Sequence, residues 1–264
     1  MNEVLIRLGC FFGAFALFAT AEVLYPRRQR VAARLIRWTS NIGISALNQL
    51  VVRLFAPISA MLLAELCASQ GWGLLNLVPL WSGLAIFLAI MLLDLSIYVQ
   101  HLLFHRVPLF WRLHRVHHAD TEFDVTTGVR FHPVSILFSA MLKLLIVWLI
   151  GPPAVAVLIF EVLLNITSLF NHSNVYIPPA VDRVIRLLVV TPDMHRVHHS
   201  VARCETDSNF GFNFPWWDRL FGTYRAQPVQ GHEGMDIGLD VFRAEKERRM
   251  DFMLTQPFRN ESDE

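Results

Sequence analysis

Charged residues are scarce in this sequence. Asp, Glu, Lys and Arg make up 17% of the 264 residues, whereas hydrophobic residues make up 54%. Soluble globular domains usually carry about 25% charged residues, so an ordinary soluble domain of this length is a poor match. The composition predicts a protein whose main solvent is a membrane.

Cysteine is also scarce. The three cysteines, Cys10, Cys67 and Cys204, lie far apart in the chain and none is part of a CxxC pair. This spacing suggests neither a disulfide framework nor a cysteine-ligated zinc or iron–sulfur site. The sequence also lacks the glycine fingerprint of a dinucleotide-binding fold and any haem-attachment motif. Electrons for a redox reaction would therefore have to come from a separate protein.

The chain has no broad basic surface. Its net charge is +1, and its basic residues are scattered apart from a run at Arg27, Arg28 and Arg30. A nucleic-acid partner is not expected, because phosphate binding needs clustered positive charge. Since positive charge next to a membrane span marks the cytosolic side, the run assigns residues 27–37 to the cytosol.

Five apolar stretches are long enough, or nearly so, to cross a bilayer. The first could also be a signal peptide, since Ala19-Thr20-Ala21 resembles a cleavage site, but Glu3 stands where a signal peptide has basic residues. In the second, Arg53 and Pro57 predict a kinked or partly interfacial helix. Asn41, Ser45 and Asn48 share a face of this helix that should contact protein. The stretches are residues 4–24, 42–68, 80–99, 134–150 and 154–169.

The last two stretches read as a hairpin, because only Gly151-Pro152-Pro153 separates them. Counting the crossings places ten of the 11 histidines at the cytosolic face. We therefore expect an all-α integral membrane protein with about four to five spanning or hairpin helices and a cytosolic, histidine-rich helical cap. Its regions would be N-terminal membrane helices (1–79), a catalytic core (80–225) and a cytosolic tail (226–264).

The histidines fall into strings with helical spacing. His101 and His105 are four residues apart, and HRVHH occurs twice. Positions i, i+3 and i+4 share a helix face, so each string can direct its rings towards one point. Thr191 is a candidate N-cap for the last string, with Pro192 in the first turn. The two HRVHH strings are His114 to His118 and His195 to His199, and His132 is placed to cap a helix that begins at Pro133.

This many histidines on one face favours metal binding over the ordinary alternative of surface or hydrogen-bonded core histidines, which suits His232 in the polar tail. Eight to ten imidazoles suit two metals with four or five ligands each. Imidazole accepts iron, zinc or copper, so the ligand type does not name the metal. No HExxH motif is present, which argues against a zinc protease of that class.

In this order, the strings HLLFH, HRVHH and HRVHH resemble those of the fatty acid hydroxylase and sterol desaturase superfamily of membrane di-iron oxygenases. FHP at residues 131–133, NHSN at 171–174 and the string from Glu205 to Arg225 add to the resemblance, which covers residues 94–225. The resemblance implies two iron ions, dioxygen as oxidant, and metal ligation by His101, His105, His114, His117, His118, His172, His195, His198 and His199. Some members have a second histidine four residues before the position of His172, where this chain has Ser168, so His132 is the candidate to complete that site.

A metal-bound imidazole usually donates a hydrogen bond from its second ring nitrogen to a carboxylate or carbonyl. Asp94 and Tyr98 precede His101 on one helix face and are candidates for this supporting role, as are Asp193, Asp207 and Asp218. A polar stripe of Glu161, Asn165 and Ser168 leads to His172 and could line a substrate or proton path, or simply join helices. Trp216 and Trp217 are expected to anchor at the membrane interface or to pack within the cap.

These features together predict an O2-dependent hydroxylase or desaturase that acts on a lipid or sterol-like substrate in the membrane. Its electron donor would be of the kinds usual in the superfamily: cytochrome b5, ferredoxin or a reductase. A membrane zinc hydrolase that uses the same histidines is one alternative, and a metal transporter is another. Because the acidic end from Arg259 to Glu264 resembles no retrieval signal, a bacterial cytoplasmic membrane is favoured, with the site on the cytosolic side.

Overall fold

Helices are the only regular elements in the part of the chain that the structure, a computed structural model, describes, namely residues 3–29 and 34–260. Two isolated bridges, Pro26 with Val175 and Ser200 with Ile237, are the only β-type pairings in these ranges. Arg30 and the acidic end from Glu261 lie outside the described residues. The predicted all-α class is confirmed.

The long apolar helices correspond closely to the predicted spans. By length and composition, five stretches of the described chain could cross a membrane, which is the architecture of an integral membrane protein. The second of these stretches contains two helices, α2 and α3. We call the six helices of the five stretches the membrane bundle; they are α1 (Glu3–Leu24), α2 (Arg34–Phe55), α3 (Ala60–Gln70), α4 (Ser82–Arg106), α6 (Pro133–Ile150) and α7 (Ala154–Asn171).

The predicted kink near Pro57 is a complete break between α2 and α3. Helix α2 ends at Phe55, and Ser59 caps the next helix by accepting a hydrogen bond from the Leu62 amide at 3.1 Å. Of the α2 residues expected to face protein, Asn41 and Asn48 are buried and Ser45 is half-buried. The break follows from Pro57, which removes a helical hydrogen bond.

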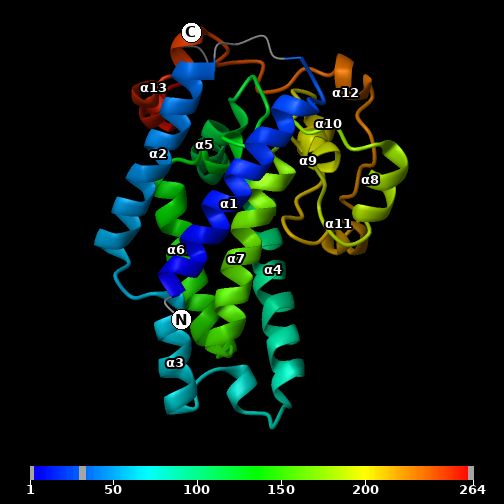
Figure 1. Cartoon of the computed structure of the whole chain (residues 1–264). Helices are drawn as coiled ribbons and strands as arrows, with labels where there is room; N and C mark the ends of the chain where they lie inside the picture. Colours follow the sequence, from blue (N-terminus) through cyan, green and yellow to red (C-terminus); the bar gives the residue numbers. More distant parts are fainter. Residues whose placement is uncertain (1–2, 30–33, 261–264) are drawn as a thin grey trace.

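The α6–α7 hairpin turns where the sequence predicts. Gly151 ends α6 with a φ of +62°, a backbone conformation that favours glycine. A Cβ at Gly151 would meet the Trp72 carbonyl oxygen at 2.3 Å, and one at Gly73 would meet the Gly151 nitrogen at the same distance. Two turns therefore pack closely at the end of the bundle that lies lowest in Figure 1.

Small side chains let the bundle helices pack closely. Ala60 and Ala64 of α3 meet Leu93 of α4, Val147 of α6 and Phe160 of α7 in one buried cluster, as is usual for helices that pack within a bilayer. Helix α1 lies along α7 and buries little of its own surface. Most of α1 is therefore available to contact lipid.

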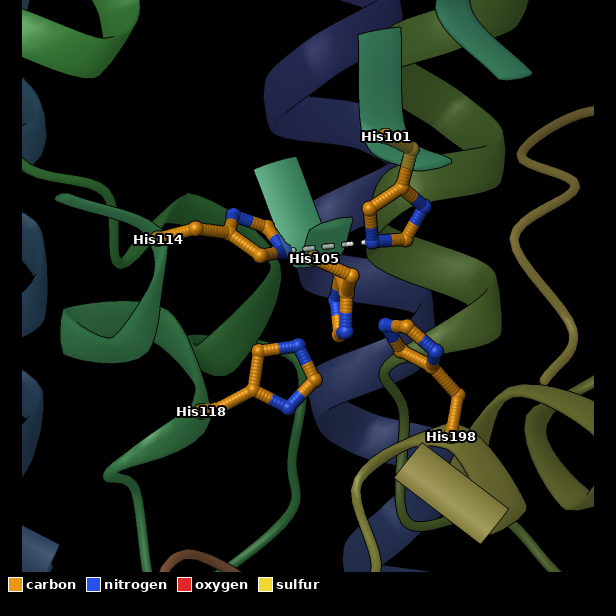
Figure 2. A group of neighbouring side chains, drawn as sticks. All are labelled: His101, His105, His114, His118 and His198. Atoms are coloured by element: carbon orange, nitrogen blue, oxygen red, sulfur yellow. Dashed lines mark hydrogen bonds between the residues drawn. The ribbon is translucent and has the colours of Figure 1, made fainter. Parts of the chain in front are cut away.

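The upper end of the bundle in Figure 1 carries a layer of short helices, which we call the cap. The histidine strings come together there, and Figure 2 shows five of their rings converging from three helices. The cap consists of α5 (Pro108–His118), α8 (Pro179–Ile185), α9 (Pro192–His198), α10 (Arg203–Thr206), α11 (Trp216–Leu220), α12 (Gly231–Gly234), α13 (Met250–Thr255) and the 3-10 turns η2 (Thr127–Val129), η3 (Glu245–Arg248) and η4 (Gln256–Phe258); a further turn, η1 (Leu74–Asn76), lies at the other end of the bundle.

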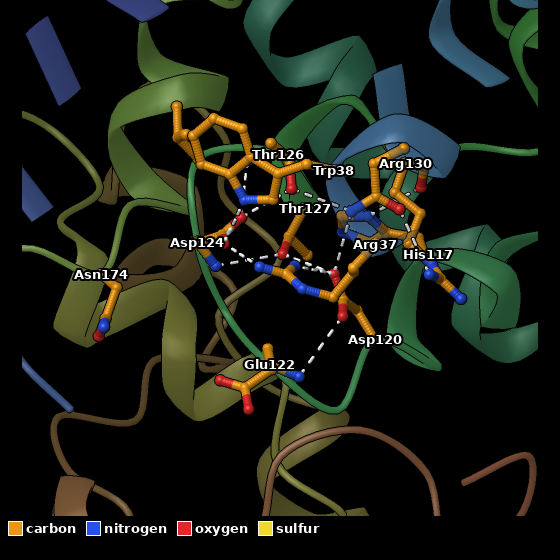
Figure 3. A network of polar contacts seen from close by, with 12 residues as sticks. Arg37, Trp38, His117, Asp120, Glu122, Asp124, Thr126, Thr127, Arg130 and Asn174 are labelled. Carbon is orange, nitrogen blue, oxygen red and sulfur yellow. Dashed lines mark hydrogen bonds and ion pairs between the residues drawn. The ribbon is translucent and has the colours of Figure 1, made fainter. Parts of the chain in front are cut away.

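The loop between α5 and α6 is held by a buried polar network (Figure 3). Arg37, at the start of α2, donates to Asp120 at 2.8 Å and also pairs with Asp124. Thr127 and Asn41 donate to the same carboxylate oxygen of Asp120. Burial alone would raise the pKa of Asp120, but the guanidinium groups of Arg37 and Arg130 lower it below the usual range. Both carboxylates of the network therefore depend on Arg37.

Substituting Arg37→Met should strongly destabilise the protein. The change removes the charge that compensates two buried carboxylates, which typically costs about 3–5 kcal/mol. We expect a correspondingly lower denaturant midpoint for the detergent-purified protein. Arg53→Met is the matched control, because Arg53 lies on the same helix and is exposed, and its effect should stay within about 0.5 kcal/mol. Equal midpoints for the two variants would show that the network contributes little.

Candidate metal centre

Nine buried histidines form two adjoining groups, each with its ligand nitrogens within 4.8 Å of one another. The group of five, drawn in Figure 2, draws rings from α4, α5 and α9. The group of four draws rings from α5, α9 and the end of α7. This division agrees with the expectation of four or five ligands for each of two metals. The members are His101, His105, His114, His118 and His198 in the first group, and His117, His172, His195 and His199 in the second.

Each HRVHH string contributes histidines to both groups. In the first string, His114 and His118 belong to the group of five and His117 to the group of four. In the second string, the first and last histidines belong to the group of four and His198 to the group of five. On a helix, residues i, i+3 and i+4 form one face, but the i+3 and i+4 side chains point to opposite edges of that face. Each string therefore lies between the two groups and contributes to both.

Local sequence signals, a capping threonine and two prolines, mark where α9 and α5 begin. Thr191 is the N-cap of α9 and accepts from the Met194 amide at 3.4 Å, with Pro192 as the first helical residue. Pro108 begins α5 directly after α4 ends. The short connection folds α5 back against α4, which brings the first HRVHH string to the rings of His101 and His105.

Backbone carbonyls hold four of the rings through Nδ1. His101 donates to the Phe210 oxygen at 2.9 Å, and His198 to the Ser208 oxygen at 2.7 Å. In the other group, His117 donates to the Arg130 oxygen at 3.2 Å, and His172 to the Ser168 oxygen at 2.8 Å. A carbonyl only accepts, so each of these Nδ1 atoms carries the hydrogen and each Nε2 presents a lone pair.

The lone pairs of His117 and His172 face each other, because their Nε2 atoms are 3.1 Å apart. Two acceptors at this distance repel unless a cation lies beside both of them. Two nitrogens that bind one metal at about 2.1 Å, at right angles, are separated by about 3 Å, which fits this spacing. The residues present therefore fit a metal ion in the group of four.

The group of five fits a metal by a different observation. Both ring nitrogens of His105 and His118, and Nε2 of His198, are buried without a hydrogen-bond partner among the described residues. Leaving a buried polar atom unpaired costs about 1–3 kcal/mol. A bound metal would satisfy one nitrogen of each ring, and this donor set of imidazoles suits iron, zinc or copper.

Burial keeps the rings of the cap neutral, which is the form that binds metal. Burial lowers the pKa of His172 to about 3. Burial, together with the neighbouring imidazoles, also lowers the pKa of His117, His118, His195 and His199 well below the usual value. None of these rings needs to lose a proton at neutral pH before it binds a metal ion.

Of the acids expected to support the ligands, Asp207 lies nearest to a ring. Its Oδ1 is 3.4 Å from Nδ1 of His105, and its Oδ2 accepts from Arg203. Asp218 contacts the backbone beside a ring rather than the ring itself: it accepts from the amides of Phe210 and Gly211, at 2.8 Å each. It thereby holds the segment whose carbonyl orients His101.

The other candidates for support do not touch the ligand rings. Asp94 accepts from Trp217 at 2.8 Å, and the Tyr98 hydroxyl hydrogen-bonds Thr223. Asp193 pairs with Arg27 and Arg196, and His232 lies buried 3.4 Å from it rather than at the surface. These residues fasten the cap to the bundle or to the N-terminal arginines.

The structure does not bring His132 into either histidine group. Its Nδ1 accepts from the Val134 amide and caps α6, as the sequence predicts, while its Nε2 contacts the Leu254 oxygen at 3.2 Å. Both ring nitrogens are therefore engaged by backbone. The group of four is formed without it.

The polar stripe on α7 divides into two parts. The Glu161 carboxylate pairs with Lys143 of α6 and Arg7 of α1, while the Glu161 backbone carbonyl accepts from the Asn165 side chain. Ser168 lies at the histidine groups: its hydroxyl donates to the Gly128 oxygen, and its carbonyl holds His172. The Glu161 end joins helices, and the Ser168 end orients the His172 ring.

Sequence reasoning missed the residues that position the loop between α5 and α6. Arg130 is fully buried, donates to the Val116 carbonyl and, through its own carbonyl, orients His117. Glu22 of α1 accepts from the amides of Val125 and Asn174. For Glu22 the available signal was a charged residue in an otherwise apolar stretch, whereas Arg37 lies in a basic segment that offered no such signal.

Comparison with known proteins agrees with this site. A family model described as fatty acid hydroxylase matches residues 86–223, a little more than half of the chain. Ornithine lipid hydroxylase OlsE of Rhizobium tropici is 30% identical over 154 residues, which are 58% of this chain and 45% of that protein. Alkylglycerol monooxygenase of Homo sapiens is 27% identical over 166 residues, 61% of this chain and 35% of that protein.

Cholesterol 25-hydroxylase of Homo sapiens is 30% identical over 147 residues, which are 54% of this chain and 52% of that protein. The chain thus spans about half of the length of these relatives, or less. No solved structure matches it. The matched range contains the nine clustered histidines, the backbone carbonyls that accept hydrogen bonds from four of them, and the Asp207 carboxylate. The chain belongs to the fatty acid hydroxylase family.

Proposed function

We propose that this protein is a membrane-bound di-iron oxygenase that uses O2 to hydroxylate a lipid substrate. The observation that carries the proposal is the division of nine neutral, buried imidazoles into groups of five and four. The named relatives are hydroxylases and monooxygenases, which favours hydroxylation over desaturation and leaves the zinc hydrolase alternative without support. A pair of iron ions, when bound, would supply an oxidant able to attack an unactivated C–H bond.

The histidines would hold each ion, and the surrounding rings would exclude water. Phe210 lies with its edge to His101, His105 and His198, with ring centroids 5.1–5.7 Å apart. Phe131 stacks on His117 at 4.5 Å. Such apolar walls protect a reactive centre from solvent.

The position of the groups suits a lipid substrate. His101 and His105 lie in the last two turns of α4, directly above the apolar part of a candidate span. A lipid chain in the bilayer would need to rise only a short distance to reach these rings. Positioning of this kind supplies much of the rate of such reactions.

The polar end of the bundle is proposed to face the cytosol of a bacterial cell. Arg27 and Arg28 stand at this end of α1, in agreement with the tendency of positive charge to stay inside. Electrons would arrive from that side through a separate donor, of the cytochrome b5, ferredoxin or reductase kind. We keep residues 80–225 as the proposed catalytic core, with N-terminal membrane helices (1–79) and a tail (226–264) that packs on α5 through Arg115.

Removing one ligand should release metal, whereas removing the nearby helix cap should not. We expect His172→Ala to lose about one iron ion per chain relative to the unchanged protein, because only three imidazoles would remain in the group of four. His132→Ala should keep its iron, because His132 lies outside both groups. Metal analysis of anaerobically purified protein tests this. Equal losses in the two variants would contradict the assignment of the groups.

The reaction itself is tested by isotope labelling. Membranes that contain the protein and a suitable reductant should form a hydroxylated lipid whose new oxygen comes from 18O2 and not from H218O. His198→Ala membranes should form none. Mass spectrometry of the extracted lipids distinguishes an added oxygen from the loss of two hydrogens. Oxygen derived from water, or product formation without O2, would overturn the proposed function.

A further inference from the structure

Two stretches of the cap expose an apolar surface, which we call the α8–α11 patch. The first stretch is α8 with the residues after it, and the second is α11 with the residue after it. They are joined by Trp216, whose indole donates to the Leu187 carbonyl at 2.7 Å. Leu188 is 61% exposed and Leu220 68% exposed. The patch consists of Val181, Val184, Leu187, Leu188, Leu220 and Phe221.

The patch concentrates the exposed apolar side chains of the cap. Among the large hydrophobic residues that are exposed after His172 in the described chain, only Tyr176, Val229 and Phe258 lie outside it. Contiguous apolar surface of this kind is uncommon on a face that meets water. It marks a surface that meets another apolar phase.

Helix α8 has the reverse of the burial pattern of a surface helix on a soluble protein, with charged residues buried and apolar residues exposed. Its Asp182 and Arg186 are buried, ion-paired with each other four residues apart, and face the protein. Val181 and Val184 face outwards. In a water-soluble protein the apolar side of a surface helix faces the core. The reversed pattern fits a helix whose outer face contacts lipid.

Contacts with α4 set the depth of the patch. Trp217 of α11 donates to Asp94 at 2.8 Å, and Phe221 stacks on Tyr98 with ring centroids 5.3 Å apart. Asp94 and Tyr98 lie twelve and eight residues before Arg106, the last residue of α4. At 1.5 Å per residue, α11 therefore reaches about 12–18 Å down from the polar end of a candidate span. Figure 1 shows α11 beside the upper half of α4 and below α9.

From these observations we infer that the α8–α11 patch is inserted into the lipid leaflet at the histidine end of the bundle. The occupant of the surface is the acyl-chain region of that leaflet, because α11 packs on α4 at the depth of Asp94 and Tyr98, within a candidate span. Arg183, on α8, is exposed beside the patch, where its long side chain can extend to lipid phosphates. The inference concerns the membrane contact of the cap and does not depend on the proposed reaction.

Spin labels at single cysteines test the inference in the full-length protein in liposomes. Labels at Leu188→Cys and Leu220→Cys are compared with Phe87→Cys, on the exposed face of α4, and with Val229→Cys, which is 80% exposed and outside the patch. Cys10 and Cys204 are first replaced by alanine, while the buried Cys67 is kept. The variants are accepted when their helix content and elution volume in detergent match those of the unchanged protein.

The patch labels should behave like the label at residue 87. They should be relaxed strongly by O2, which concentrates in the bilayer, and weakly by a water-soluble nickel complex. The label at residue 229 should show the reverse. Labels at 188 and 220 that match residue 229 would overturn the inference. Spin–spin broadening between labelled chains at residue 188 would also overturn it, because a second copy of the chain would then cover the patch.

A second measurement uses the unsubstituted chain. Liposomes that contain a phosphatidylcholine with a photoreactive group on its acyl chain are illuminated, and the labelled peptides are identified by mass spectrometry. Peptides that contain residues 181–188 and 220–221 should carry lipid, whereas the peptide around Val229 should not. Absence of label from both patch peptides, with α4 labelled as expected, would contradict leaflet insertion.

Discussion

Nine neutral imidazoles are buried in the cap, and each of their ring nitrogens needs a hydrogen-bond partner or a metal. The protein supplies hydrogen-bond partners for only some of these nitrogens. Four Nδ1 atoms find backbone carbonyls, which fixes four Nε2 lone pairs towards the interior. Facing lone pairs, such as those of His117 and His172, make this arrangement unfavourable without cations. The need to satisfy these nitrogens is the constraint that links the cap, the loops and the ends of the bundle helices.

Much of the remaining polar structure serves to hold the carbonyls that orient the rings. Asp218 anchors the amides beside Phe210, and the Arg37 network anchors the loop that ends at Arg130. At Gly128 a Cβ would meet the Ser168 oxygen at 2.6 Å, so only glycine allows the loop to approach α7 where His172 is held. These groups act through backbone position, and this explains why charged residues occur inside an otherwise apolar chain.

Sequence reasoning predicted most of the fold because hydrophobic length and helix signals are local. The hairpin at Gly151, the break at Pro57 and the caps at Thr191 and His132 all follow from nearby residues. The division of the histidines was not predictable, because helical spacing puts His114, His117 and His118 on one face but does not say which neighbouring helix each ring meets. His132 illustrates the difference: its local role as a cap was evident, and its distance from the two groups depends on long-range packing.

The inside-out pattern of α8 was likewise hidden in the sequence. From the sequence alone, Val181 and Val184 would be expected on the buried side of a short helix, and Asp182 and Arg186 on its solvent-exposed side. The structure reveals that protein lies on the charged side, because Asp182 and Arg186 are buried and Arg186 donates to the Ala226 carbonyl at 2.9 Å. In a chain whose surroundings are lipid, exposure and polarity lose their usual relation.

The central claim is that the two histidine groups each hold one ion of an iron pair. Anomalous diffraction from crystals of the protein, grown with iron and measured on both sides of the iron absorption edge, tests it most directly. The account predicts two iron peaks, one surrounded by His101, His105, His114, His118 and His198 and the other by His117, His172, His195 and His199. A single peak, or peaks that lie outside both groups, would contradict it.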